Sequence, residues 1–213
     1  MAKSVLMLCL GALCQGAAAV ALPPLRPGGA LMPQLSMKNL AASYDKFSRE
    51  QYLALACVQS GFLRGTSDAA SQVMRGVEFD PSHSLAMGTI GLIFSGFVGA
   101  SWLRHLEGRL GSGTSTADIV KKSAADFFCY APCANSCYLF FVPLLTVLYS
   151  NGAVDVDAAM MALQHGFVAA MALELSMFAP YNLLSFRMIP ADYRPQTTAA
   201  ACAGYTIILS ALC

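Results

Sequence analysis

Long apolar runs separated by short polar connections make up the chain from Tyr44 onward. Five of these runs are predicted to be helices, over residues 44–74, 82–110, 117–149, 158–186 and 196–212. Residues 85–103, inside the second run, carry no charge, and a helix needs about 20 apolar residues to cross a bilayer. The pattern therefore predicts an all-α fold, a multi-pass transmembrane bundle of four to five helices over residues 44–213.

Signals for helix ends support this layout. Ser115 or Thr116 is a suitable N-cap for the third helix. Asp155 and Asp157 suit the positive N-terminal end of the fourth. Pro180 is expected to kink the fourth helix, and Pro132 and Pro143 the third.

Basic residues follow the alternation of the predicted loops. One side receives Lys46, Arg49, Arg104, Arg109, Lys121, Lys122, Arg187 and Arg194, whereas the other receives only Arg75. Such asymmetry is what the positive-inside rule produces in membrane proteins. It favours five crossings over four, provided that the first helix spans.

Composition agrees with a membrane protein. Apolar residues form 56% of the 213 residues and charged residues only 12%, whereas soluble domains are about 25% charged. We therefore expect lipid to contact much of the surface. A net charge of +1 argues against a nucleic-acid partner.

The first 43 residues have the composition of a targeting leader. Residues 1–21 have a basic start, an apolar core and an Ala-x-Ala ending, which predicts a signal peptide. Residues 22–43 lack acidic residues and contain basic, Ser and Pro residues, as transit peptides do. A signal followed by a transit-like arm favours a complex plastid. The alternative is a plain signal peptide followed by a disordered arm.

Two opposite charges interrupt the first predicted helix. Arg64 and Asp68 are four residues apart, so they are expected to pair on one face, which Gln72 continues. Ions inside a membrane segment turn toward the bundle interior, which predicts these three residues as pore-lining. The alternative is a polar clamp without a transport role. Gly61 and Gly65 form a G-x-x-x-G pair that lets another helix approach closely. Gly88, Gly91 and Gly96 in the second run are further predicted helix-packing positions.

Two further acidic residues lie in apolar helices. Asp126 is expected either at a pore mouth or paired with a nearby Lys. Glu174 is expected to line a pore or to pair with Arg64. The alternative is a protonated, uncharged carboxyl. Trp102, close to Arg104, suits an anchor at the membrane interface.

Cys129, Cys133 and Cys137 recur every four residues along one helical face. Their thiolates are capable of binding a soft metal or sensing redox state, but small residues at a helix contact account for them more simply. No nucleophile elbow, phosphate loop or metal-ligand cluster of standard spacing occurs. The sequence predicts no enzyme, metal or cofactor.

Several stretches resemble the motifs of the 22-kilodalton peroxisomal membrane protein family. "SGFLRGTSDAASQ" is similar to its S-G-x-L-x-x-x-G-D-x-x-x-Q motif, and "FDPSHSLAMGTIGLIFSGFVGASWL" and "KKSAADFFCYAP" resemble the motifs that follow. "FAPYNLLSFRMIPADYRP" resembles the closing motif. The matching positions include Gly88, Gly91, Gly96, Trp102, Pro132, Pro180, Pro190 and Arg194. Phe97, Ala100 and Phe127 replace the family's Pro, His and Gln, so the chain is a divergent member.

The resemblance implies a small integral membrane protein of an organelle, with four transmembrane helices and a role in organelle homeostasis. It also implies channel-like passage of small solutes, which we predict as the function. The alternative is a non-conducting structural or assembly subunit of a membrane complex. The expected partners are membrane lipid, small solutes, and further copies or a complex. A plastid membrane is favoured, with the mitochondrial inner membrane and the peroxisomal membrane as alternatives.

Overall fold

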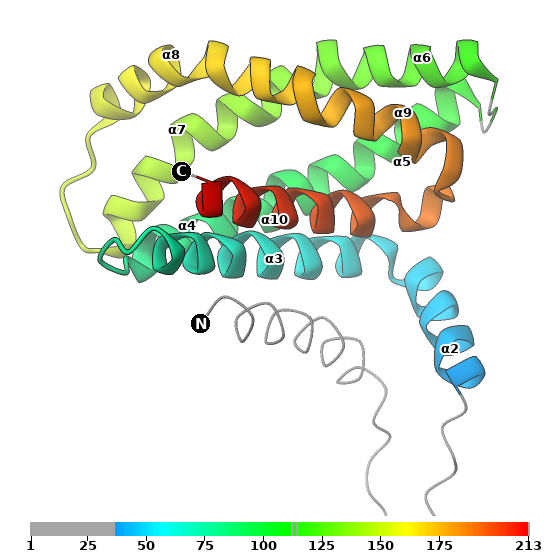
Figure 1. Cartoon of the computed structure of the whole chain (residues 1–213), viewed down its shortest axis with the longest axis horizontal. Coiled ribbons are helices and arrows are strands. Elements are labelled where there is room, and N and C mark those ends of the chain that lie inside the picture. Colours follow the sequence, from blue (N-terminus) through cyan, green and yellow to red (C-terminus); the bar gives the residue numbers. More distant parts are fainter. Residues whose placement is uncertain (1–36, 112, 114, 213) are drawn as a thin grey trace, which may run out of the picture. The chain divides into compact units, whose positions relative to one another are not determined.

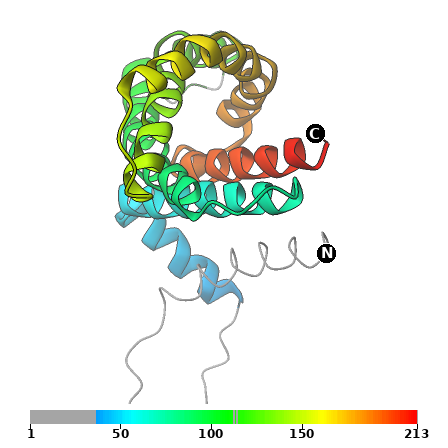
Figure 2. The ribbon, with the colours of Figure 1, turned by 90° about the vertical axis from the view of Figure 1, so that its left-hand side faces the viewer.

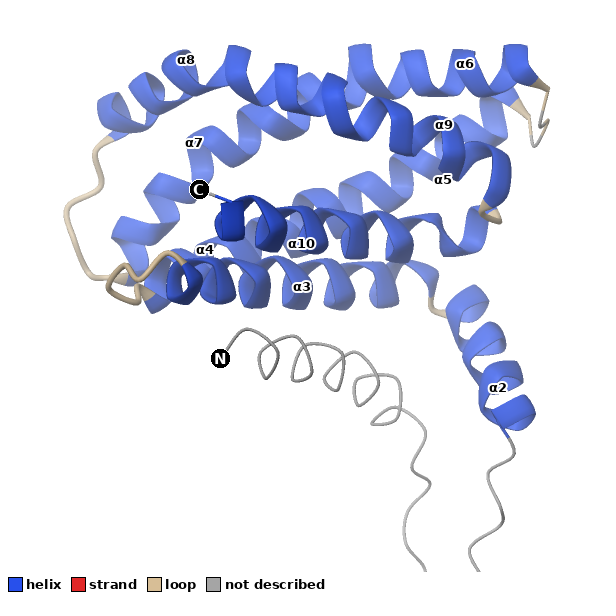
Figure 3. Ribbon diagram, in the orientation of Figure 1, coloured by secondary structure: helices blue, strands red, loops and turns tan. Residues whose placement is uncertain are grey.

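The fold is seen in a computed structural model that describes residues 37–111, 113 and 115–212. The predicted signal peptide (1–21) and most of the predicted arm (22–43) lie outside these residues. The described residues are all-helical, as predicted, and contain no strand (Figure 3). The chain divides into two compact units, Met1–Glu50 and Gln51–Cys213.

Helix α2 (Met37–Glu50) belongs to the first unit. Its charged residues pair one turn apart, Arg49 with Asp45 at 3.2 Å and Lys46 with Glu50 at 3.8 Å. The helix ends before Gln51, whose φ of −113° and ψ of 32° leave helical geometry. The prediction of one continuous helix over 44–74 is therefore wrong. The composition changes at the break: the residues of α2 are largely polar, and those that follow Gln51 are largely apolar.

The second unit contains the remaining helices (Figure 1). In chain order they are α3 (Tyr52–Met74), α4 (Pro81–Ile90), η1 (Gly91–Val98), α5 (Gly99–Leu110), α6 (Thr116–Ala125), η2 (Asp126–Tyr130), α7 (Ala131–Tyr149), α8 (Val156–Leu173), η3 (Glu174–Phe178), α9 (Ala179–Met188), η4 (Ala191–Tyr193) and α10 (Arg194–Leu212). The stretches η1, η2 and η3 are π-helical and join their neighbours into three continuous helices. The last four predicted runs correspond to these three helices and to α10, within a few residues.

Those three continuous helices are long and apolar enough to cross a membrane: Pro81–Leu110, Thr116–Tyr149 and Val156–Met188. The prediction of a multi-pass helical protein is confirmed at this level. The count of four to five crossings stays a prediction, because it requires α3 and α10 to cross as well.

Side-chain caps fix where several helices begin. The carboxylate of Asp80 accepts hydrogen bonds from the backbone N–H groups of Ser82 and His83 at the start of α4. Ser115 and Asp155 do the same for α6 and α8, which confirms both as start signals. These caps satisfy N–H groups that have no partner within the helix.

Burial is inverted relative to a soluble protein. Fully or nearly buried polar residues include Ser60, Ser67, Asp68, Ser71, Gln72, Lys122, Asp126 and Arg194. Large apolar side chains lie outside, with Phe128 74% and Val168 75% exposed. Water would penalise such a surface, whereas lipid would not. The outer face is therefore the part of the unit that contacts lipid.

Each helix of the second unit packs against one or more of the others. α10 packs against α3, α3 against α4 and η1, α4 against α7, and α7 against α8, while α6 packs against α9. Figures 1 and 2 show α10 and α3 side by side, although more than a hundred residues separate them along the chain. In the end view of Figure 2 the helices of this unit are arranged in a ring.

Glycine allows α3 to approach α4 and η1 closely. The five predicted packing positions all lie where these helices cross: Gly61, Gly65, Gly88, Gly91 and Gly96. A Cβ atom on Gly96 would lie 2.4 Å from the Cα of Cys57, which is closer than atoms can approach. Close backbone contact of this kind is how helices pack inside a membrane.

Proline follows two of the π-helical stretches. Pro132 is the second residue of α7, just after η2, and Pro180 is the second residue of α9, just after η3. A proline inside a helix lacks one N–H donor, and its ring crowds the carbonyl four residues earlier. A wider π turn relieves that crowding. The sequence reasoning expected kinks at these prolines, and the structure places a π turn before each of them.

Candidate functional site

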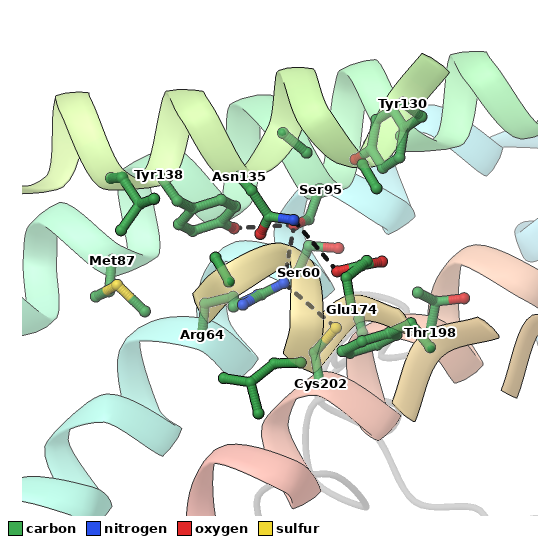
Figure 4. Close-up of a pocket in the computed structure, with 18 of the residues that line it drawn as sticks. Ser60, Arg64, Met87, Ser95, Tyr130, Asn135, Tyr138, Glu174, Thr198 and Cys202 are labelled. Atoms are coloured by element: carbon green, nitrogen blue, oxygen red, sulfur yellow. Dashed lines mark hydrogen bonds between the residues drawn. The ribbon is translucent and has the colours of Figure 1, made fainter. Parts of the chain in front are cut away.

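A cavity of ≈ 470 Å³ lies inside the second unit. Residues from α3, α4, η1, α7, η3 and α10 line most of it, and Figure 4 shows many of their side chains. Most of the wall is apolar. Its ionisable side chains include Arg64, His83, Asp126 and Glu174.

Arg64 reaches the cavity from α3. Its Nη2 donates to Ser95 Oγ at 3.4 Å and to Cys202 Sγ at 3.3 Å. Its guanidinium carbon lies 4.7 Å from the centre of the Tyr138 ring, a cation–π contact. Arg64 Nε is buried and has no hydrogen-bond partner. Within the part of the chain that the structure describes, no carboxylate forms an ion pair with this cation.

Tyr138 and Ser95 are hydrogen-bonded to each other beside Arg64. Their hydroxyl groups are 2.9 Å apart, which joins α7 to η1 directly above the guanidinium (Figure 4). The neighbours of Arg64 are thus neutral hydroxyl, thiol and aromatic groups. They solvate the charge only in part, because none of them carries a full negative charge.

The predicted pairing of Arg64 with Asp68 is wrong. Asp68 Oδ2 accepts from Gln72 Nε2 at 2.8 Å and from Ser84 Oγ at 2.8 Å, and lies 3.0 Å from His83 Nδ1. Helical spacing does place the two residues on one face, but the long Arg side chain extends into the cavity. The short Asp side chain stays at the contact between α3 and α4, where three polar partners are within reach.

Gln72 closes the turn between α3 and α4. Its Oε1 accepts from the Asp80 N–H at 2.6 Å, and its Nε2 donates to the Asp80 carbonyl at 3.2 Å and to Ser84 Oγ at 3.1 Å. Asp68 and Gln72 are buried polar residues, but neither lines the cavity. Their contacts match the alternative interpretation of a polar clamp.

Asp126 lies at the start of η2 and faces inward. Its Oδ1 accepts from Trp102 Nε1 at 2.9 Å, and its Oδ2 accepts from Asn182 Nδ2 at 2.6 Å. The expected pairing of Asp126 with a nearby Lys is therefore wrong, because the Lys122 side chain turns to Glu107 instead. Trp102, expected as an interfacial anchor, also points inward and stacks on Tyr130.

Glu174 begins η3 and faces the same cavity. Its Oε2 accepts one long hydrogen bond, from Asn135 Nδ2 at 3.5 Å. Among the described side chains it has no cationic partner, so the expected pairing with Arg64 is absent as a direct contact. Figure 4 shows Glu174 and Arg64 directed toward the same part of the cavity.

Asp126 and Glu174 occupy matching positions in a short repeat. "DFFCYAP" (126–132) and "ELSMFAP" (174–180) each begin with an acidic residue, continue through a π-helical stretch and end in Ala-Pro. π-Helical turns occur often at functional sites. The sequence reasoning missed this repeat, although the recurring acid-to-Pro spacing was a visible signal. It also missed His83, Asn135 and Asn182, whose partners lie on other helices.

A group of charged side chains outside the cavity joins α5, α6 and α10. Glu107 Oε1 accepts from Lys122 Nζ at 3.0 Å and also pairs with Arg194 Nη1. Arg194 Nε further donates to the Ile189 carbonyl at 2.8 Å, next to Pro190. The motif residues Pro190 and Arg194 therefore shape the turn between α9 and α10.

The cysteine stripe lies on the outer surface. Cys129 and Cys133 are exposed and Cys137 is half-buried. No group of three or more metal-binding side chains occurs among the described residues. Cys202 differs from these three, because it is buried beside Arg64.

Comparison with known proteins finds relatives among mitochondrial membrane proteins. The Mitochondrial inner membrane protein Mpv17 of Bos taurus is 32% identical over 139 residues, which cover 63% of this chain and 75% of the relative. The Homo sapiens and Rattus norvegicus proteins of the same name are 31% and 30% identical over the same lengths. No protein-family model matches the chain, and no solved structure matches it.

Proposed function

The chain belongs, as a divergent member, to the Mpv17 family, which includes inner-membrane proteins of mitochondria, and from this premise we propose that it forms a pore for small solutes in an organelle membrane. The proposed role is passage and not catalysis, and the pore would serve the homeostasis of the organelle. No cofactor is required for it.

The observation that carries the proposal is a cavity whose largely apolar wall carries charged and amide side chains. Ionisable and amide side chains gather around it, among them Arg64, Glu174 and Asn135, while the outer face of the same helices is apolar. Polar groups inside a membrane are costly, so they are typical of pathways for solutes or ions. Clamping the helices together would not require a cavity of this size.

We also propose that α3 and α10 cross the membrane, which gives five crossings. The asymmetry of basic residues supports this arrangement, since Arg104, Arg109 and Arg194 would share one side. The α3 helix has 23 residues and α10 has 19, lengths close to that of a bilayer.

Reconstitution tests the pore directly. Purified protein in planar bilayers is expected to conduct, and Arg64→Met or Glu174→Gln is expected to change the unitary conductance or its ion selectivity. Arg75→Met is the matched control, because Arg75 is exposed and lies away from the cavity. Conductance that responds equally to all three variants would argue against the cavity as the path.

Electrical silence of every variant, with passage of no small solute into liposomes, would contradict the pore. Co-purification with a large membrane complex, together with loss of that complex on deletion of the gene, would then establish the assembly-subunit alternative.

For localisation we propose a plastid membrane, on the basis of the two-part leader in residues 1–43. The mitochondrial inner membrane is the competing site, because the named relatives reside there. A fluorescent fusion with and without residues 1–43 tests the choice. Plastid fluorescence that depends on the leader supports the proposal, whereas mitochondrial fluorescence contradicts it.

A further inference from the structure

We propose that the cavity binds a small zwitterionic group, with Arg64 holding its anionic end and Glu174 its cationic end. The inference names the solute class of the proposed pore and in that respect rests on it. Its test measures binding and not conduction, so either can fail while the other holds.

Arg64 offers an incompletely satisfied cation to the cavity. Its partners are the hydroxyl of Ser95, the thiol of Cys202 and the ring of Tyr138, and its buried Nε has no partner. A buried charge is stable only when an opposite charge or a full set of hydrogen bonds compensates it. A carboxylate or phosphate is the group that a guanidinium binds best.

Glu174 offers the opposite charge in the same space. Among the described residues, its contact within the cavity is a long hydrogen bond of 3.5 Å from Asn135 Nδ2. The carboxylate is thus free to accept further hydrogen bonds, and an ammonium group supplies both donors and charge. Asp126, the other acidic residue of the wall, is already occupied by Trp102 and Asn182.

The two charges together disfavour a simple ion. A monoanion that approaches Arg64 is repelled by Glu174, and a monocation that approaches Glu174 is repelled by Arg64. A molecule that carries both charges satisfies both residues. The cavity volume of ≈ 470 Å³ is suitable for a small molecule, because ligand sites measure about 300–1,000 Å³.

Calorimetric titration of the full chain in maltoside micelles tests the proposal with three matched probes. Alanine carries both charges, propionate only the anion and ethylamine only the cation. We expect alanine to bind at least about tenfold more tightly than either single ion. Equal affinity for all three, or no binding of any, would overturn the proposal.

Two variants assign the charges. Arg64→Met is expected to weaken alanine binding by about tenfold or more. Glu174→Gln is expected to remove the preference for alanine and to strengthen propionate binding, a gain that misfolding cannot produce. Arg75→Met, the control for a lost surface cation, is expected to bind as the wild type does. If Glu174→Gln leaves the ranking of the three probes unchanged, the proposal is wrong.

The same chemistry exists in a free solute and in the headgroup of a zwitterionic lipid. Repeating the alanine titration with short-chain phosphatidylethanolamine separates the two sources. Unchanged alanine binding assigns the site to free solutes, and displacement of alanine assigns it to the headgroup. Both results support a zwitterion site. If the lipid abolishes alanine binding while propionate still binds, the two probes occupy different sites, and the proposal is contradicted.

Discussion

At the residue scale, the cation and the anion of α3 have separate roles. Arg64 turns to the cavity, whereas Asp68 joins His83, Ser84 and Gln72 at the turn into α4. Asp68 Oδ2 receives three polar contacts at or below 3.0 Å, and the side chain is 5% exposed. Its removal would leave the buried Ser84 hydroxyl without an acceptor and take one partner from both Gln72 and His83.

We expect Asp68→Ala to lower the free energy of unfolding by about 2–3 kcal/mol, since an unsatisfied buried donor costs about 1–3 kcal/mol. Asp68→Asn should cost less, because its amide oxygen still accepts. Unfolding by dodecyl sulfate in mixed micelles measures both. Asp157→Ala, at an exposed position, is the control, and an equal loss there would contradict the role assigned to Asp68.

Sequence reasoning at this scale identified polar residues but not their partners. Arg64, Asp68 and Glu174 stand out because charges are rare in apolar runs. The contact of Asp68 with His83, however, joins two helices across a turn, and the contact of Asp126 with Asn182 joins residues 56 positions apart. Helical periodicity describes faces within one helix and contains no information on which faces meet.

At the element scale, the close crossing of α3 with α4 and η1 depends on glycines, which have no side chain. Gly61 and Gly65 lie against Gly88, and Gly96 lies against the backbone of Cys57. The G-x-x-x-G spacing indicated close packing from the sequence. The π-helical form of η1, which contains Gly96, was not predictable from that spacing.

Gly96→Ala is expected to destabilise the protein by about 1–3 kcal/mol, the usual cost of overpacking. Gly108→Ala is the matched control, because a Cβ there meets no atom within 4 Å. Gly108 lies inside α5, so Ala should stabilise by about 0.5–1 kcal/mol through helix propensity. The same dodecyl sulfate titration compares the two variants, and stabilisation by both would show that the helices are not in close contact.

Helix boundaries were largely predictable, because caps and prolines mark them. Ser115 and Asp155 begin their helices as expected. The break at Gln51 was not, since no Gly, Pro or capping residue marks it. The change from polar to apolar composition is the one local feature that accompanies it.

At the scale of the second unit, one carboxylate ties three helices together. Glu107 of α5 bonds Lys122 of α6 and Arg194 of α10. Lys122 is 1% exposed and Arg194 6%, so both cations depend on this single anion.

Glu107→Gln is expected to cost about 3–5 kcal/mol, because it leaves two buried cations without a counter-charge. Adding Lys122→Met should restore part of that loss, since it removes one of the two cations. Glu50→Gln, which alters the exposed pair with Lys46, should change stability by less than about 0.5 kcal/mol. Thermal unfolding in maltoside micelles provides the comparison, and an additive double variant would contradict the coupling.

The wide turns at η2 and η3 also change the phase of their helices. A regular α-helix advances about 100° per residue, so one extra residue in a turn rotates everything beyond it by that angle. A helical wheel drawn continuously through Asp126 or Glu174 would thus assign the residues of α7 or α9 to the wrong side. Alignments of this chain with its relatives should treat each half-helix as an independent segment, with a gap permitted at the acidic residue.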